Sequence, residues 1–410
     1  MKTIYILFAI CFLSFSLPAQ NVGIGTATPH ANALLHVDLG TSPTKGILFS
    51  GTYNQFSSTL PDLGAGTRMM FYPGKSAFRA GTVSGNQWDN LNVGRYSTAT
   101  GYGTTASATA SAAMGYNSTA SGNYSTAMGL STNASGVGAT AMGSNTTASG
   151  TVSLATGYNT IASANNASAI GYFTTASGDA STAMGDNTTA SESASTAMGN
   201  NTTASGSAST AMGYNTTASG DFSTAIGTYV STNGHNGALI IGDNSTYTIM
   251  NTASDNSFRA RFDGGYRFYT SADLSTNCLL SGGSNAWSTT SDVRLKENFA
   301  EINGEDFLQK IKAMPLTSWN YKKQNPQTFR HYGPMAQDFY AAFGKDKYGT
   351  VGNDTTINSA DFDGVNLIAI QALEKRTAIQ QQELNEKQNE IDVLKARLLK
   401  LENALSQKVH

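Results

Sequence analysis

Between residues 97 and 242 the chain repeats one pattern of small apolar and small polar residues every fourteen positions. The consensus is S-T-A-M-G-x-N-T-T-A-S-G-x-x, with Ala two places before each register glycine and five places after nine of them. The register glycines are Gly101, Gly115, Gly129, Gly143, Gly157, Gly171, Gly185, Gly199, Gly213 and Gly227. Glycine costs a helix interior about 1 kcal/mol relative to Ala, and Thr, Ser and Asn favour extended and turn backbone. The pattern therefore predicts short strands, with the glycines at turns.

One repeat is long enough for two short strands with a turn after each, because fourteen extended residues would span roughly 46 Å. Coils stacked in parallel at about 4.8 Å would form a mainly β, parallel β-roll solenoid on the order of 45 to 50 Å long. The expected inward side chains are Ala with one Met or Ile per coil: Met114, Met128, Met142, Ile170, Met184, Met198, Met212 and Ile226. Such a core buries little apolar surface, so we expect an oligomer, with a trimer as our interpretation.

The A-M-G-x-N-T-T-A-S-G register resembles the head repeats of trimeric autotransporter adhesins. In that family such units form a left-handed parallel β-roll in a bundle of three chains. The resemblance covers about residues 97–242 and implies a homotrimer.

The first residues, 1–19, predict a cleavable secretory signal peptide. Lys2 is followed by an apolar run from Ile4 to Leu17, and cleavage is expected near Ala19. This run is shorter than the roughly 20 residues that a membrane span needs, so we expect no span after removal of the signal. The hypothesis is an exported protein, at the cell surface or extracellular. Cys278 would then be the remaining cysteine, which excludes an intrachain disulfide.

Charge is unevenly distributed and marks the domain organisation. Residues 97–242 contain no Lys or Arg, whereas 291–410 are rich in charge. We expect a β cap at 20–96, a β connector at 243–290 and a hairpin around Asp263-Gly264-Gly265. A net charge of −2 with 13% charged residues gives no basis for nucleic-acid binding. No cofactor or metal site is predicted.

From Ser291 the sequence becomes S-D-V-R-L-K-E-N-F, followed by a predicted helix at 306–313, a predicted strand at 317–321 and H-Y-G-P-M-A-Q-D from His331. Together these resemble the endosialidase-type intramolecular chaperone domain, over residues 291 to about 405. In that family the domain ends trimeric β fibres, such as phage tail spikes, and cuts itself off after assembly. We place a small α+β chaperone domain at 291–365.

The resemblance implies a catalytic dyad with Ser291 as nucleophile and Lys296 as base, and a scissile bond between Thr290 and Ser291. A lysine can serve as a base when desolvation lowers its pKa. From the residues alone, Ser291-Asp292 could instead be a helix N-cap and Lys296 a solvated surface lysine. His331 is a candidate orienting residue, with packing or hydrogen bonding as the alternative role.

The last helix, at 366–410, carries a heptad pattern. One core position holds Ile370, Leu384, Ile391, Leu398 and Leu405, and the other holds Leu373, Leu394 and Leu401. The pattern favours a trimeric coiled coil that sets three chains in register, with a surface amphipathic helix as the alternative.

These features lead to one main functional hypothesis and three alternatives. The main one is an exported trimeric, adhesin-like fibre whose chaperone domain releases itself by a single-turnover serine endopeptidase step; its partner would be a surface glycan or another cell-surface ligand. A fibre that never cuts itself is the first alternative. A glycan-cleaving spike is less favoured because the repeats have few carboxylates. Ice binding is the last, based on the pairs Thr146-Thr147, Thr188-Thr189 and Thr202-Thr203.

Overall fold

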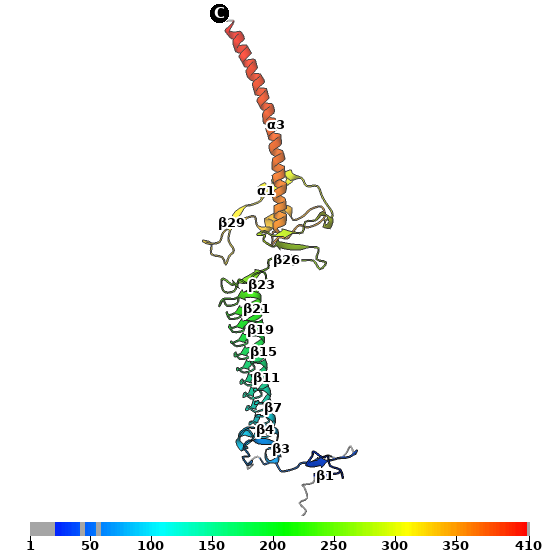
Figure 1. The fold of residues 1–410 in the computed structure, drawn as a ribbon. Coiled ribbons are helices and arrows are strands. Elements are labelled where there is room, and N and C mark those ends of the chain that lie inside the picture. Colours follow the sequence, from blue (N-terminus) through cyan, green and yellow to red (C-terminus); the bar gives the residue numbers. More distant parts are fainter. Residues whose placement is uncertain (1–20, 42–45, 55–58, 408–410) are drawn as a thin grey trace, which may run out of the picture. The chain divides into compact units, whose positions relative to one another are not determined.

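The computed structural model describes residues 21–41, 46–54 and 59–407 (Figure 1). The predicted signal peptide lies outside these residues. The chain divides into two compact units. The first extends through Arg267 and includes Leu280–Trp287, whereas the second comprises Phe268–Leu279 and the chain from Ser288 onward.

The first unit is dominated by a stack of β coils (Figure 1). Each regular coil has one five-residue and one two-residue strand. The long strands are β5 Thr98–Tyr102, β7 Ala112–Tyr116, β9 Thr126–Leu130, β11 Thr140–Ser144, β13 Leu154–Tyr158, β15 Ser168–Tyr172, β17 Thr182–Asp186 and β19 Thr196–Asn200. The short strands are β6 Thr105–Ala106, β8 Thr119–Ala120, β10 Asn133–Ala134, β12 Thr147–Ala148, β14 Ile161–Ala162, β16 Thr175–Ala176, β18 Thr189–Ala190 and β20 Thr203–Ala204.

The last coils depart from this regular form. Their strands are β21 Thr210–Ala218, β22 Thr224–Ser231, β23 Leu239–Gly242, β24 Met250–Asn251 and β25 Phe258–Arg261. Strands pair in parallel with the equivalent strand one repeat away, as Ala141 does with Ala155. The predicted fold class, a parallel β-solenoid with a fourteen-residue period followed by a small unit and a long helix, is confirmed.

The interior of the coils is built from very small side chains. Both Ala positions of the repeat are fully buried, and columns of Ser and Thr fill the remaining interior. Buried Ser hydroxyls can donate to a carbonyl three residues earlier, as Ser153 Oγ does to Gly150 O at 2.7 Å. The prediction that Met and Ile point inward is wrong: successive strand residues face opposite sides, so the residue after each buried Ala faces outward. Met128 and Met184 are 38% and 37% exposed.

The register glycines do not lie at turns, which corrects a second prediction. Gly171 is the fourth residue of β15, with φ +128°. A Cβ on Gly171 would lie 2.0 Å from the carbonyl oxygen of Gly185 in the next coil. Glycine is therefore required here by the close approach of neighbouring strands and by a backbone conformation that other residues rarely adopt.

Side chains on the surface of the rod also repeat from coil to coil. Tyr102 stacks on Tyr116 with ring centroids 4.9 Å apart, and Tyr158 stacks on Tyr172 at 5.2 Å. Side-chain amides form a similar ladder, in which Asn187 Nδ2 donates to Asn201 Oδ1 at 3.0 Å. The ring faces in these stacks cover one another, so we interpret the stacks as contacts that hold adjacent coils together.

The first coil is closed by the antiparallel pair β3 Gly66–Tyr72 and β4 Ala77–Val83. Arg79 of β4 aligns with the buried Ala99, and its guanidinium donates to Ser97 O, Ser97 Oγ and Ala106 O at 2.8 to 3.0 Å. Burial lowers the pKa of Arg79 to about 10. Arg79 and the buried Trp88 thus close the end of the narrow interior. The other elements of this region are β1 Val22–Ile24, β2 Leu35–Val37, η1 Pro73–Lys75 and η2 Asn90–Asn92.

The predicted hairpin around Asp263-Gly264-Gly265 is wrong. A turn exists there, since Gly265 N donates to Phe262 O, but β25 belongs to the solenoid and β26 to another sheet. That three-stranded sheet consists of β26 Gly265–Tyr269, β27 Asn277–Ser281 and β28 Ser288–Thr289. The remaining elements are η3 Val293–Leu295, α1 Gly304–Ala313, β29 Thr317–Trp319, β30 His331–Gly333, α2 Ala336–Phe343 and α3 Ser359–Ser406.

We predict that Gly171→Ala destabilises the solenoid by about 3 kcal/mol or more, because it combines backbone strain with a clash against the next coil. Chemical unfolding monitored by circular dichroism would measure the loss. Gly138→Ala is the matched control: its φ is +67°, but the nearest atom to an added Cβ is 3.7 Å away. It should cost only about 1 to 2 kcal/mol. Equal effects of the two substitutions would contradict the close-approach argument.

Candidate functional site

Ser291 and Lys296 lie together in the second unit. Lys296 Nζ donates a hydrogen bond to Ser291 Oγ at 2.7 Å. The contact depends on η3, which folds the chain back between the two residues. Leu295 N donates to Asp292 O at 3.1 Å, and Lys296 N donates to Val293 O at 3.2 Å. A short 3₁₀ turn thus brings two side chains that are five residues apart in the sequence into direct contact.

Asp292 caps this turn. Its Oδ1 accepts from the backbone N–H of Arg294 at 2.9 Å, and its carboxylate is also paired with the Arg294 side chain, with Oδ2 and Nη2 2.5 Å apart. The hydrogen bonds from the Arg294 side chain, and then from its backbone, hold the pKa of Asp292 below its usual range. Asp292 is therefore an N-cap, as the alternative interpretation of the sequence proposed. Ser291 does not take part in the cap interactions described and contacts Lys296.

The residue before Ser291 is anchored on the three-stranded sheet. Thr290 N donates to Asn277 O at 3.3 Å, and Asn277 N donates to Thr290 Oγ1 at 3.3 Å. Ser291 and Lys296 are both exposed in the single chain, and Thr290 is partly buried. The Thr290–Ser291 bond therefore joins a strand-like segment to the turn that carries the two polar side chains.

His331 lies in another cluster of side chains. Its ring stacks on Trp319 with centroids 4.6 Å apart, and its Nε2 is 3.2 Å from Gln324 Oε1. Tyr321 packs edge-on against the same imidazole. The described contacts of His331 are of the packing and hydrogen-bonding kind and do not include Ser291 or Lys296.

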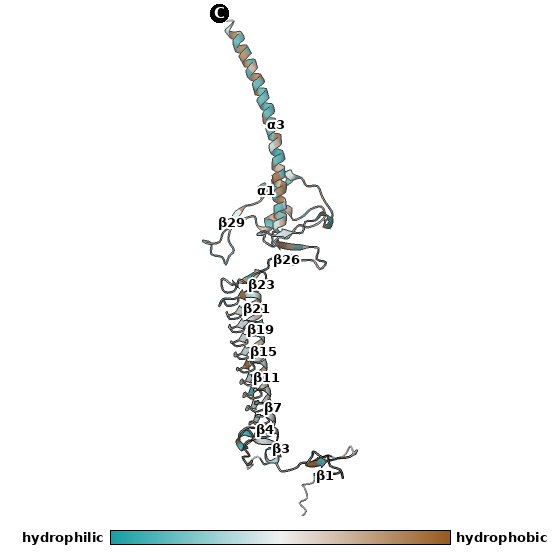
Figure 2. Ribbon diagram, viewed as in Figure 1, coloured by the Kyte–Doolittle hydropathy of each residue, from teal (hydrophilic) through white to brown (hydrophobic). Residues whose placement is uncertain are grey.

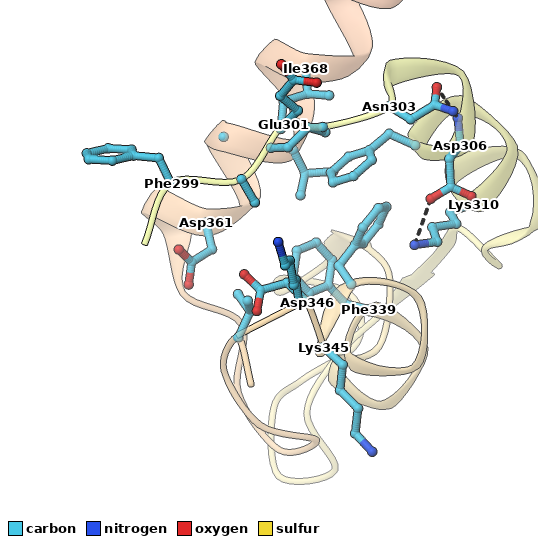
Figure 3. A pocket seen from close by; sticks show the side chains of 18 of the residues that line it. Phe299, Glu301, Asn303, Asp306, Lys310, Phe339, Lys345, Asp346, Asp361 and Ile368 are labelled. Carbon is cyan, nitrogen blue, oxygen red and sulfur yellow. Dashed lines mark hydrogen bonds and ion pairs between the residues drawn. The ribbon is translucent and has the colours of Figure 1, made fainter. Parts of the chain in front are cut away.

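A cavity of about 850 Å³ lies in the same unit, between α1, the first turns of α3, residues 299–303 and residues 345–351. Its lining includes Phe339 and Phe343, which are buried and pack on each other with ring centroids 5.2 Å apart. Figure 3 shows charged side chains around the opening and Phe299 directed away from it. Lys310 Nζ is paired with Asp306 at 2.9 Å. The cavity is lined by neither Ser291 nor Lys296.

The predicted core positions of α3 are exposed in the single chain. Leu384, Leu394 and Leu405 have exposed fractions above 60%. Figure 2 shows hydrophobic and hydrophilic residues interspersed along this helix. Near its start, α3 packs on α1, where Gly304 leaves room for Ala372 and Arg376 is paired with Glu305. Beyond this contact, from Ile379 to Leu405, the large apolar side chains of α3 are exposed in the single chain.

Comparison with known families agrees with this arrangement. The YadA head domain repeat matches residues 93–118, 106–132, 134–160, 148–174, 176–202 and 204–229. The family described as chaperone of endosialidase matches residues 291–346. The chain carries YadA-type head repeats and an endosialidase-type chaperone domain. Among curated proteins, none matches the chain.

The two matches support a trimeric adhesin or fibre with a chaperone-type C-terminal domain. Head repeats of this kind indicate a surface or extracellular protein, and their family suggests a homotrimer. In the described part of the chain, no helix combines the length and apolar character needed to cross a membrane. The same residues contain no cluster of three or more His, Cys, Asp or Glu side chains that could hold a metal ion.

The sequence offered Ser291-Asp292 as a cap and the Ser291–Lys296 dyad as alternatives, whereas the structure contains both, because Asp292 caps the turn and Ser291 contacts Lys296. One feature of the chaperone domain, the cavity, was not predicted. It could not be, because its lining residues come from separate segments that only the packing of α1, α2 and α3 brings together.

We predict that Phe339→Ala destabilises the chaperone domain by about 3 to 5 kcal/mol, because Phe339 is 6% exposed and packs on Phe343 and Phe362. Thermal unfolding of the full chain would measure this as a lower transition temperature for the C-terminal unit. Phe329→Ala is the control, since that side chain is 52% exposed and its loss should change stability by less than about 1 kcal/mol. Similar losses at both positions would contradict the aromatic core.

Proposed function

We propose that this chain is an exported homotrimeric fibre protein whose chaperone domain guides assembly and then releases itself by cutting the Thr290–Ser291 bond. The observation that carries the proposal is the 2.7 Å contact between Lys296 Nζ and Ser291 Oγ, inside the segment that matches the endosialidase chaperone family. The domains proposed are those expected from the sequence: a cap at 20–96, repeats at 97–242, a connector at 243–290, the chaperone at 291–365 and a coiled-coil helix at 366–410.

The chemistry begins with Ser291 attacking the carbonyl carbon of Thr290. Neutral Lys296 takes the hydroxyl proton as Oγ bonds to that carbon, and the proton passes to the Ser291 nitrogen as the C–N bond breaks. The result is an ester between Thr290 and Ser291 Oγ, with a free Ser291 amine. Water then hydrolyses the ester, which gives a Thr290 carboxylate and restores the Ser291 hydroxyl. The step is a single turnover because the substrate is the chain itself.

Assembly would complete this site. In one chain Ser291 and Lys296 are both exposed, and an exposed ammonium stays hydrated. A lysine acts as a base when its surroundings exclude water, so we propose that the other two chains cover the dyad. Cleavage would then follow trimer formation, and the released domain would leave behind a fibre that has lost its assembly nucleus.

The trimer has two supports of its own. The first is an outward-facing row of side chains, one from each long strand. It begins with Met69 and Ala80, is mostly Met and Ile as far as Ile241, and is interrupted by Thr100 and Thr156. The second is the exposed apolar seam of α3, typical of a coiled coil. Both are apolar surfaces that a single chain leaves in water and that association would bury.

The alternatives differ in what supports them. A fibre that keeps its chaperone domain would have the same trimer but no fragment. Ice binding loses support because the first Thr of each pair, at 146, 188 and 202, is buried inside the coils. A glycan remains the proposed ligand class for the rod, because the repeats at 97–242 offer neutral amide and hydroxyl groups and contain no Lys or Arg.

For self-cleavage, we predict that wild-type protein yields a fragment of residues 291–410 and that Ser291→Ala yields none. Lys296→Gln should slow the appearance of the fragment by about 10² to 10⁴-fold, the range for loss of a general base. Gel electrophoresis and mass analysis of the new N-terminus would measure both. Ser288→Ala is the matched control, and it should cleave like wild type. Uncut protein from both wild type and Ser291→Ala would contradict the proposal.

For assembly, we predict that Leu394→Lys lowers trimer affinity at least tenfold, whereas Val393→Lys does not. The two residues are neighbours on α3 and are 61% and 53% exposed in the single chain, but only Leu394 lies in the heptad core. Native mass spectrometry over a dilution series, in protein that also carries Ser291→Ala, would keep α3 attached. If the Ser291→Ala parent has the mass of a single chain, or if the two Lys variants have equal effects, the trimeric coiled coil is refuted.

A further inference from the structure

We infer that Asp292 is a positioning residue for the Ser291–Lys296 dyad, because it caps the turn that folds Lys296 back onto Ser291. The inference rests on the proposed self-cleavage and adds a residue that controls it. Asp292 contacts neither of the two side chains directly in the described interactions; it acts through the backbone of η3.

The need for such a residue follows from chain geometry. Five extended residues separate their Cα atoms by roughly 16 to 18 Å, which a lysine side chain cannot span to reach the serine. In the structure, two backbone hydrogen bonds shorten the path: Leu295 N to Asp292 O and Lys296 N to Val293 O. A single 3₁₀ turn of this kind is weak on its own, because only these two bonds hold it.

The carboxylate of Asp292 provides a hydrogen-bond acceptor for the start of the turn. At the N-terminus of a helical turn the first N–H groups have no partner within the turn. Asp292 Oδ1 accepts from one of them, the N–H of Arg294, at 2.9 Å, and the backbone of Asp292 is extended, as at an N-cap. On the other side of the nucleophile, Thr290 is anchored to Asn277 of β27. Ser291 thus lies between two fixed points, a strand and a capped turn.

The Arg294 side chain has a smaller part in this arrangement. Its guanidinium pairs with the Asp292 carboxylate, but it is 85% exposed, and an exposed ion pair contributes little to stability. The functional contact is the one from the backbone N–H of Arg294, which any residue except proline can make at this position. This separates the roles of the two partners in an experiment.

The test compares cleavage rates of the full chain carrying Asp292→Ala, Asp292→Asn or Arg294→Ala. Asn keeps an oxygen that accepts from the N–H of residue 294, so Asp292→Asn should cleave within about threefold of wild type. Asp292→Ala removes the cap and should cleave at least tenfold more slowly. Arg294→Ala should stay within about threefold of wild type. Native mass and unfolding temperature would be measured for each variant, to verify that they assemble equally.

A second measurement follows the turn itself. In protein carrying Ser291→Ala, amide hydrogen exchange at Leu295 and Lys296 should become faster with Asp292→Ala and not with Asp292→Asn. Exchange at Phe307, which donates to Asn303 O at the start of α1, is the internal control and should not change. Rescue by Asn in both assays would separate positioning of the dyad from a general loss of stability.

The outcomes separate this inference from the self-cleavage on which it rests. If wild type cleaves and Ser291→Ala does not, self-cleavage holds; equal rates for wild type and Asp292→Ala would then overturn the role of Asp292 alone. Equal slowing by Asp292→Ala and Asp292→Asn would also overturn it, because the cap would not be the cause. If wild type does not cleave, both proposals fail.

Discussion

The repeats depend on one constraint, the close stacking of neighbouring coils through their backbones. At each register glycine the chain passes so near the next coil that an added Cβ would meet a carbonyl oxygen at about 2 Å. Coils this flat enclose an interior with room for little beyond Ala, Ser and Thr. The larger apolar side chains, including the Met and Ile row, are therefore on the outside. The rod thus gains order from backbone pairing and leaves much of its apolar surface uncovered.

The contrast between ordered backbone pairing and uncovered apolar surface explains why the repeats and the C-terminal part of the chain differ in composition. The repeats have strong local register but few features that would align three separate chains. The C-terminal part supplies those features, with a charged 48-residue helix whose apolar seam is exposed in the single chain. Under the proposed function, a domain that is needed for alignment and not for the finished fibre is released after assembly, and the contact between Ser291 and Lys296 is the site of that release.

Much of the fold followed from the sequence because a period is a property of the chain itself. Fourteen residues set the size of a coil, and identical repeats force neighbouring coils into the same register, as Ala141 with Ala155. The sequence did not predict which residues of each strand face the interior. Whether Met128 faces in or out depends on where the chain turns, and the sequence placed Gly129 at a turn when it lies within a strand. Likewise, the strands on either side of Asp263 pair with different partners, because tertiary pairing outweighed a local hairpin signal.

The candidate site also combines features that the sequence determined with features that only the tertiary structure decided. The sequence by itself determined that Ser291 and Lys296 stand five residues apart in a recognisable motif, and that His331 begins the H-Y-G-P-M-A-Q-D segment. Only the tertiary structure decided which of these residues meet. A capped 3₁₀ turn joins Ser291 and Lys296, whereas the β29–β30 pairing carries His331 to Trp319. The physical reason is that spacing along a chain limits how far apart two groups can be, while hydrogen bonds and packing select one conformation among those that the spacing allows.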